Sequence, residues 1–448
     1  MSANVKNMTE GKPLPLIVSF SLPLMLGNIF QQMYTVVDTM VVGKGLGVQA
    51  LAALGASDWL VWLMLGVIQG LTQGFGIRMA QEFGARQTEK LKSTLGCSVV
   101  LTVISAAVLT LGGQLAAQSV LRLLKTPDAI ISDTLLYVRI IFLGTPVVMA
   151  YNLLATILRS LGDGKTPLNA MIVASFTNIG LDLLFVLVLR WGIAGAAAAT
   201  LIAQAVSGIY CLEKVRKIDF LRLEKSHFAL DGTLAARLMK LGSPMAFQNA
   251  VIALGGMIVT SVVNGFGVVF IGGYTASNKL YGILEVAATS YGYAMVTYVG
   301  QNLGAGKLHR IREGMKAAMV LSMITSVVIA AVMILFGKGI LSLFLSGTPE
   351  ETAQALEVAY QYLFLMSVCL PVLYVLHVVR SAIQGMGDTV KPMLSGISEF
   401  IMRTAGSLTL PGIMGGSGIF YAEVSAWLGA DLILVPSYFI TLKKLEKE

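Results

Sequence analysis

Two acidic residues stand inside strongly apolar stretches of the sequence, each with a polar residue one helical turn before it. Asp38 follows Tyr34 by four positions, and Asp182 follows Asn178 by four in the segment SFTNIGLDLLFV. Residues four apart lie on one face of a helix, so each acid shares its face with a hydrogen-bonding group. Because a charged side chain at mid-bilayer costs about 2.5 to 3.5 kcal/mol, both acids require an explanation.

A buried carboxylate inside a membrane can couple transport to an ion gradient. It can take up a proton on one side and release it on the other, or bind Na⁺ when ionised. Asn178 and Asp182 could share such a cation between an amide and a carboxylate. The alternative is that Asp38 and Asp182 are helix-end residues that reach the outer interface. The apolar residues after Asp182 favour the functional interpretation for that residue.

The second half of the chain carries a further set of charged residues in or near its apolar stretches. Glu399 precedes Arg403 by four positions, which favours an ion pair within one helix. His377 could relay a proton, with a packed neutral histidine as the equal alternative. Arg380 is expected at the cytoplasmic interface. The pattern leaves the roles of the remaining acids open: Glu285, Glu423 and Asp431.

The composition requires a membrane around these residues. Of the 448 residues, 56% are hydrophobic and only 12% charged, and the mean hydropathy is +0.77. Apolar runs of about 20 residues suit membrane-spanning helices rather than barrel strands. We therefore predict an all-α membrane protein with twelve transmembrane helices, at 14–42, 49–77, 93–119, 133–158, 167–190, 193–213, 240–264, 273–300, 316–337, 354–382, 392–412 and 418–442.

The basic residues report the orientation of these helices. Most of the 32 Lys and Arg fall in alternate loops, which the positive-inside rule places in the cytoplasm. The net charge of +8 is therefore a topology signal and does not indicate nucleic acid. No cleavable signal peptide precedes the first span. We expect a multi-pass protein of the inner, cytoplasmic membrane with both termini in the cytoplasm.

The two halves repeat in sequence. QEFGA at Gln81 recurs as QNLGA at Gln301, displaced by 301 − 81 = 220, and GDGKTP at Gly162 recurs as GDTVKP at Gly387, displaced by 387 − 162 = 225. We predict an N-terminal lobe over 1–212, a cytoplasmic linker over 213–240 and a C-terminal lobe over 241–448. Six helices per repeat relate the lobes by an axis along the membrane normal, an arrangement that suits alternating access.

Pro23 lies inside the first predicted span. Its ring nitrogen has no hydrogen to donate to the Ser19 carbonyl, so the helix can bend there. A static kink is the alternative to a hinge.

Over essentially its whole length the chain resembles the multidrug and toxic compound extrusion (MATE) transporters. The resemblance rests on SLPLMLGNIFQQMYTVVDTMVVG, on QEFGA and QNLGA, on LRSLGDGKTP and on NIGLD. It implies a two-lobed, V-shaped bundle of twelve helices. It also implies export of cationic and amphipathic organic compounds in exchange for H⁺ or Na⁺.

The positions of the acids resemble those of the DinF-like branch, whose coupling site lies in the N-terminal lobe. Carried over by motif, the resemblance implies a coupling-cation site, for H⁺ or bound Na⁺, made by Asp38, Asn178, Asp182 and Thr200. Tyr34 and Asn152 are its implied polar partners. The other branch has acids in its seventh and tenth helices, where this chain has none in 241–265 and has Leu373 in the tenth.

The alternatives to export are a lipid-linked saccharide flippase of the same superfamily, a cation channel and a membrane-embedded enzyme. The sequence lacks HExxH, GxSxG, a phosphate-binding loop and a pore-loop filter, so we expect no enzyme and no channel. We expect no cofactor apart from the coupling ion, organic cations and the lipid bilayer as partners, and a functional monomer.

Overall fold

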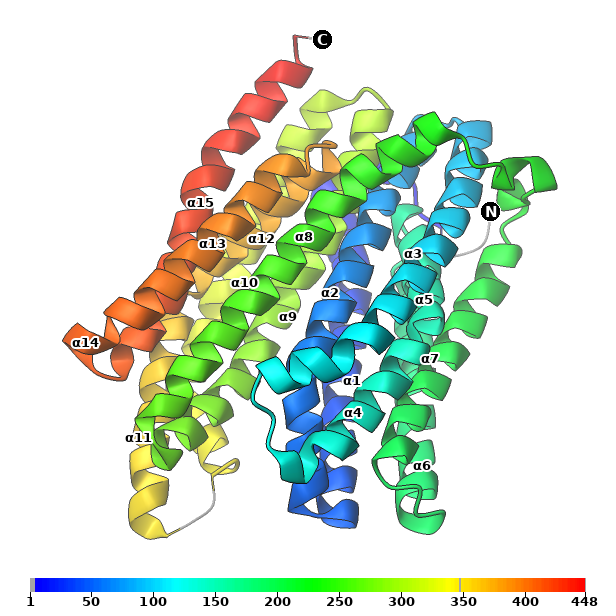
Figure 1. Ribbon diagram of the computed structural model, residues 1–448. Coiled ribbons are helices and arrows are strands. Elements are labelled where there is room, and N and C mark those ends of the chain that lie inside the picture. Colours follow the sequence, from blue (N-terminus) through cyan, green and yellow to red (C-terminus); the bar gives the residue numbers. More distant parts are fainter. Residues whose placement is uncertain (1–4, 346–347, 448) are drawn as a thin grey trace. The chain divides into compact units, whose positions relative to one another are not determined.

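The computed structural model describes residues 5–345 and 348–447, and within those ranges its regular structure is entirely helical (Figure 1). The predicted all-α fold class is confirmed. The helices are α1 (Pro13–Leu46), α2 (Val48–Gly84), α3 (Thr88–Leu123), α4 (Asp128–Leu143), α5 (Thr145–Ser160), α6 (Lys165–Asp182), the π-helix η1 (Leu183–Val188), α7 (Ile193–Arg216), η2 (Asp219–Leu221), η3 (Lys225–Phe228), α8 (Gly232–Val263), η4 (Asn264–Phe266), α9 (Val268–Gly304), α10 (Leu308–Ser342), α11 (Pro349–Val368), α12 (Leu370–Gly385), α13 (Val390–Thr409), α14 (Pro411–Met414) and α15 (Ser417–Leu445).

Each of the twelve predicted spans corresponds to a helix or to a bent pair of helices. In the described part of the chain, eight helices are long and apolar enough to cross a membrane, and two bent pairs raise the number to ten. The other two predicted spans correspond to α9 and α13, which fall outside this set. The chain is therefore a multi-pass membrane protein by length and composition of its helices.

Two spans predicted as single helices are broken, which corrects the sequence interpretation. The span 133–158 is α4 followed by α5, bent by 48°, and the span 354–382 is α11 followed by α12, bent by 51°. A proline stands in the first turn of each second helix, Pro146 in α5 and Pro371 in α12. Proline cannot donate the hydrogen bond that would continue the preceding helix, so the chain turns there.

The repeat detected in the motifs extends to the helix boundaries. Helix α9 begins 268 − 48 = 220 positions after α2 and ends 304 − 84 = 220 positions after it. Helix α12 begins 370 − 145 = 225 positions after α5 and ends 385 − 160 = 225 positions after it. These are the displacements of the QEFGA/QNLGA and GDGKTP/GDTVKP pairs. The two halves therefore fold in the same order of elements.

The GDGKTP motif has a structural role at the start of a helix. Asp163 accepts hydrogen bonds from the backbone N–H groups of Lys165 and Thr166 at 3.0 and 2.9 Å, which begins α6. Gly162 has φ of 80°, a left-handed conformation, and an added Cβ would lie 2.2 Å from the Lys6 carbonyl oxygen. In the second copy, Asp388 accepts from the backbone N–H of Lys391 at 3.2 Å and begins α13.

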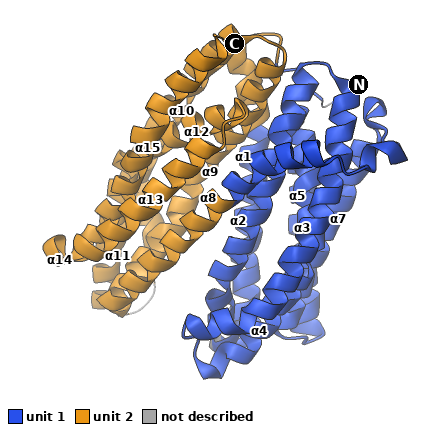
Figure 2. Cartoon of the chain, turned by 45° about the horizontal axis from the view of Figure 1, so that its top comes forward, with its two compact units in different colours: residues 1–8, 22–246 blue, residues 9–21, 247–448 orange. Residues whose placement is uncertain are grey.

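The chain forms two compact units (Figure 2). Unit 1 comprises residues 1–8 and 22–246, and unit 2 comprises residues 9–21 and 247–448. The chain passes between units inside α1, two residues before Pro23, and inside α8, shortly after Pro244. The unit boundaries thus fall inside helices, while the segment 213–240 is the end of α7, two short 3₁₀ helices and the start of α8.

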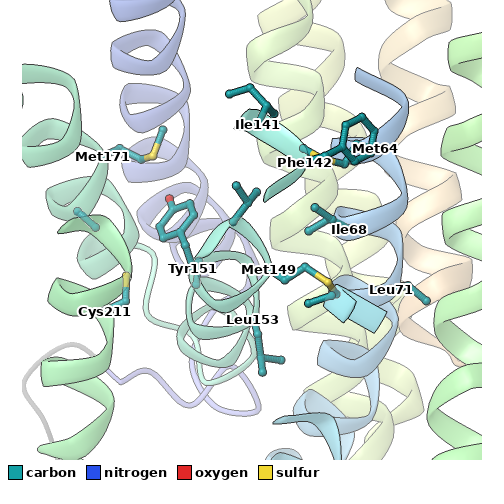
Figure 3. Packing of buried hydrophobic residues seen from close by; sticks show 14 of the residues in the cluster. Met64, Ile68, Leu71, Ile141, Phe142, Met149, Tyr151, Leu153, Met171 and Cys211 are labelled. Atoms are coloured by element: carbon teal, nitrogen blue, oxygen red, sulfur yellow. The ribbon is translucent and has the colours of Figure 1, made fainter. Parts of the chain in front are cut away.

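The core of unit 1 is packed mainly between α2, α3, α4, α5, α6 and α7, and Figure 3 shows its residues from α2, α4, α5, α6 and α7. Glycines let helices approach closely at its edge. A Cβ added at Gly74 of α2 would lie 2.3 Å from the Gly242 Cα of α8, and one at Gly70 would lie 2.3 Å from the Ala246 nitrogen. The first part of α8 is therefore seated on α2 by backbone contact, which only glycine permits.

Candidate cation site

The residues singled out as a coupling-ion site come together on α1, α6 and α7 of unit 1. Asp38 lies on α1, and Asn178 and Asp182 lie on consecutive turns at the end of α6. Their exposed fractions are 8% for Asp38, 1% for Asn178 and 0% for Asp182. The helix continues after Asp182 as the π-helix η1, a local widening often found at functional sites. Neither acid reaches water or a headgroup region through an exposed carboxylate.

The two carboxyl groups face each other. Asp38 and Asp182 lie within hydrogen-bonding range of each other across the α1/α6 interface. Both oxygens of Asp182 and the Oδ1 of Asp38 are buried without a hydrogen-bond donor. Two ionised carboxylates only accept hydrogen bonds, so neither can satisfy the other. The pair requires a proton or a cation between its oxygens.

Asn178 adds a neutral oxygen to the same place. Both its Oδ1 and its Nδ2 are buried without a partner, as is the Oε1 of Gln204 on α7. Buried amides are normally hydrogen-bonded, so these three unpartnered atoms make the cluster a candidate site for a ligand. A small cavity with room for about one water molecule lies beside Asn178, and neither Asp38 nor Asp182 lines it. It is lined by Tyr34, Met171, Ala174, Asn178, Thr200, Ala203 and Gln204.

Helix α7 contributes the wall opposite Asn178. Thr200, which the family resemblance implied, lines the cavity. Gln204, which sequence reasoning missed, stands one turn later on the same face of α7. Tyr34 lines the cavity as well, interacts with the side chains of Gln31 and Gln204, and lies within electrostatic range of both acids. The four-residue spacing of Thr200 and Gln204, which places both on one face of the helix, could have identified Gln204 from the sequence.

The other two sequence candidates lie apart from this cluster. Asn152 on α5 donates from Nδ2 to the Val148 carbonyl of its own helix at 2.8 Å and does not line the cavity. Pro23 is buried in α1, close to the point where the chain enters unit 1. Tyr137 of α4 was not identified from the sequence, yet it is buried and lies within electrostatic range of Asp38 and Asp182.

The ligand set suits a hard cation. Carboxylate, amide and hydroxyl oxygens are ligands for such ions, and a carboxyl pair can instead hold a proton. Within residues 5–345 and 348–447, no group of three or more His, Cys, Asp and Glu residues is arranged to hold a metal ion. The candidate site consists of two acids and neutral oxygens, a combination that fits either H⁺ or Na⁺.

The charged residues of the second half also come together, within unit 2. The Glu399–Arg403 pair predicted from spacing is present at 4.0 Å. Arg380, expected at the cytoplasmic interface, is buried inside unit 2 and paired with Glu399. His377 lies 3.2 Å from Glu285.

Comparisons with known proteins agree with this architecture. The family model described as MatE matches residues 23–184 and 244–408. The chain is 32% identical to the probable multidrug resistance protein YpnP of Bacillus subtilis over 424 residues, covering 94% of this chain and 91% of that protein. It is 30% identical to the probable multidrug resistance protein YoeA of the same organism, covering 74% and 73%.

A solved structure shares the fold. The crystal structure of MATE in complex with MaL6 superposes with a TM-score of 0.92 and covers 100% of both chains at 20% sequence identity. At that identity the likeness concerns the fold.

Proposed function

Because the chain belongs to the MatE family, it is a multi-pass membrane transporter and not an enzyme, and we propose that it exports cationic or amphipathic organic compounds in exchange for H⁺ or Na⁺. One observation carries the proposal. The facing carboxyl groups of Asp38 and Asp182 are buried without donors beside unpartnered amide atoms of Asn178. Such a site is stable only when a cation or a proton occupies it.

The coupling follows from electrostatics. Removing the ion leaves two carboxylates facing each other out of water, which is costly, so the empty site favours a rearrangement that opens or separates the pair. Binding the ion reverses that preference. One positive charge that moves inward gains about 2.3 kcal/mol per 100 mV, equivalent to a concentration ratio of several tens. For an uncharged amphipathic compound this electrical energy drives export. In one-for-one exchange with a monovalent organic cation the two charge movements cancel, so the concentration gradient of H⁺ or Na⁺ drives the exchange.

Helix α1 connects the ion site to a bend. Asp38 and Tyr34 lie on the part of α1 that belongs to unit 1, and Pro23 lies at the point where α1 enters that unit. Proline weakens the helix there because one main-chain hydrogen bond is missing. In the proposed cycle, occupation of Asp38 changes the preferred conformation of α1 near Pro23, and alternating access follows.

The proposal includes a place in the cell and an oligomeric state. The transporter lies in the cytoplasmic membrane with both ends in the cytoplasm; residues 1–4 and 448 of those ends lie outside the described residues. All residues of the ion site come from unit 1 of one chain, which supports function as a monomer.

Proteoliposomes with imposed pH or Na⁺ gradients test this function. The wild-type protein should extrude a fluorescent organic cation against its gradient with one of the two ions. Asp38→Asn and Asp182→Asn should abolish gradient-driven transport, and Asp133→Asn, an exposed acid on α4, should leave it intact. Extrusion at the wild-type rate by both site variants would contradict the proposal. Movement of a lipid-linked saccharide and of no organic cation would support the flippase instead.

A further inference from the structure

Unit 2 contains a chain of buried ion pairs that runs across three helices. Arg380 of α12 pairs with Glu399 of α13, and Arg403 of α13 pairs with Glu423 of α15 at 2.6 Å. Glu399 lies 4.0 Å from Arg403, which joins the two pairs. Both arginines are 7% exposed. The chain alternates in sign and contains two positive and two negative charges, so it is neutral by itself.

Glu285 stands outside this neutral chain. It lies on α9, and its Oε1 is 3.2 Å from Nε2 of His377 on α12. The side chains are 35% exposed for Glu285 and 17% for His377. Arg380 and Arg403 are within electrostatic range of Glu285, but their charges are already matched by Glu399 and Glu423. An ionised Glu285 beside a neutral His377 therefore leaves one negative charge without a counter-charge.

We propose that Glu285 and His377 together hold one exchangeable proton, which makes the pair a proton-binding site of unit 2. When the proton is bound, the pair is neutral overall, either as carboxylate and imidazolium or as carboxylic acid and imidazole. When the proton leaves, one net negative charge remains within the membrane-spanning helices. A metal ion does not take its place, because a direct contact of 3.2 Å leaves no room for one between the two side chains.

The neighbouring groups do not supply the missing charge. On α9 and α12, Tyr281 and Tyr374 lie within electrostatic range of Glu285 and are neutral. On α15, Glu423 lies within electrostatic range of Glu285 but is paired with Arg403, and Asp431 lies near Arg380 and Glu399. The described charged groups around Glu285 therefore offer it no positive charge that is not already paired.

The site is separate from the ion site of unit 1. The cation site uses α1, α6 and α7, and the Glu285–His377 pair uses α9 and α12. The inference therefore stands or fails independently of the proposed export function. Its consequence for a transporter is that protonation of unit 2 adds to whatever ion is bound in unit 1.

Nitrogen NMR of histidine rings tests the proposal directly. The chain has three histidines, so ¹⁵N-histidine labelling of the full-length protein in nanodiscs gives few signals, and His227→Gln and His309→Gln assign the third to His377. Spectra are recorded from about pH 8 down to pH 5. As the pH falls, His377 should change from the neutral form protonated at Nε2 to a form that carries the additional proton of the pair. Infrared spectra of the Glu285 carboxyl group report whether that proton resides there.

Glu285→Gln provides the decisive comparison. It removes the charge but keeps the size, so the transition of His377 should move by about one pH unit toward acid or be lost. Glu357→Gln, an exposed acid on α11, should leave it unchanged. Two results would overturn the proposal: His377 neutral with its proton on Nε2 beside an ionised Glu285 over the whole pH range, or the same transition in wild type and Glu285→Gln. Neither readout requires transport activity.

Discussion

The carboxyl groups of Asp38 on α1 and Asp182 on α6 face each other in the interior of unit 1, and no donor satisfies Asp182. Folding places the two acids together although the cost of burying them is high. A stable structure would avoid this arrangement unless a ligand joined the carboxylates. We therefore propose that a coupling ion binds at this pair, and that the neighbouring neutral oxygens contribute to its affinity.

Replacing Asn178 should weaken ion binding without unfolding the protein. Asn178→Leu removes the buried amide oxygen from the site, and we expect the apparent affinity for the coupling ion to fall by about tenfold to a hundredfold. Efflux measured as a function of Na⁺ or H⁺ concentration gives that affinity. Thr177→Val is the matched control, because Thr177 bonds only the Val173 carbonyl of its own helix, at 2.8 Å on the exposed side. If Asn178→Leu and Thr177→Val bound the coupling ion with equal affinity, Asn178 would not be part of the site.

Two different substitutions of Gln204 should change the affinity for the coupling ion in opposite directions. Gln204→Leu removes an unpartnered oxygen from the cavity wall and should weaken binding of the coupling ion by about tenfold. Gln204→Glu adds a negative charge at the same place and should strengthen binding of Na⁺ or H⁺. The same concentration series measures both. A change of the same sign in the two variants would mean that Gln204 acts through packing instead.

Pro23 should control the transport rate more than ion binding. Pro23→Ala restores a main-chain N–H inside α1 and removes a defect that costs about 3 kcal/mol in a helix interior. We expect the turnover rate to fall by about tenfold or more, because α1 bends less readily. The affinity for the ion should change little. Pro436→Ala is the control, since Pro436 also lies inside a helix, α15, away from the unit boundaries. If Pro23→Ala turned over at the wild-type rate, Pro23 would be a static kink and not a hinge.

Helices α2 and α8 approach so closely at Gly74 that a larger side chain there should destabilise the protein. Gly74→Val places atoms within 2.3 Å of the Gly242 Cα, a backbone atom that cannot turn aside, so unfolding free energy should fall by about 1 to 3 kcal/mol or more. Thermal unfolding in detergent measures the loss. Gly112→Val on α3 should have little effect because a Cβ there meets no atom within 4 Å. Similar stabilities would show that α8 is free to move away from α2.

Much of the fold followed from the sequence. Apolar length gave the spans, and the paired motifs gave a repeat that continues to the ends of α2 and α9. The breaks at Gly144 and Cys369 were not predicted, although Pro146 and Pro371 follow them. A proline near the middle of a long apolar run bends or ends a helix with equal ease, and the neighbouring packing decides which occurs.

The site was only partly predictable. Asp38, Asn178 and Asp182 were identified because charges and amides are rare in membrane helices, and that rarity is visible in a sequence. Gln204 was missed because a glutamine on an alanine-rich helix has many ordinary roles, and its missing partner appears only in three dimensions. The chain of ion pairs through Arg380 was also hidden, since its members come from separate helices.

Direct measurement of ion binding tests the central claim most closely. Purified protein in nanodiscs is titrated with ²²Na⁺ at fixed pH, and proton release is recorded in the absence of Na⁺, for wild type, Asp38→Asn, Asp182→Asn and Asp133→Asn. All four proteins are first compared by thermal unfolding. We predict that wild type and Asp133→Asn bind the coupling ion alike, and that either site variant binds it at least about tenfold more weakly. Undiminished binding in folded Asp38→Asn and Asp182→Asn would contradict the account.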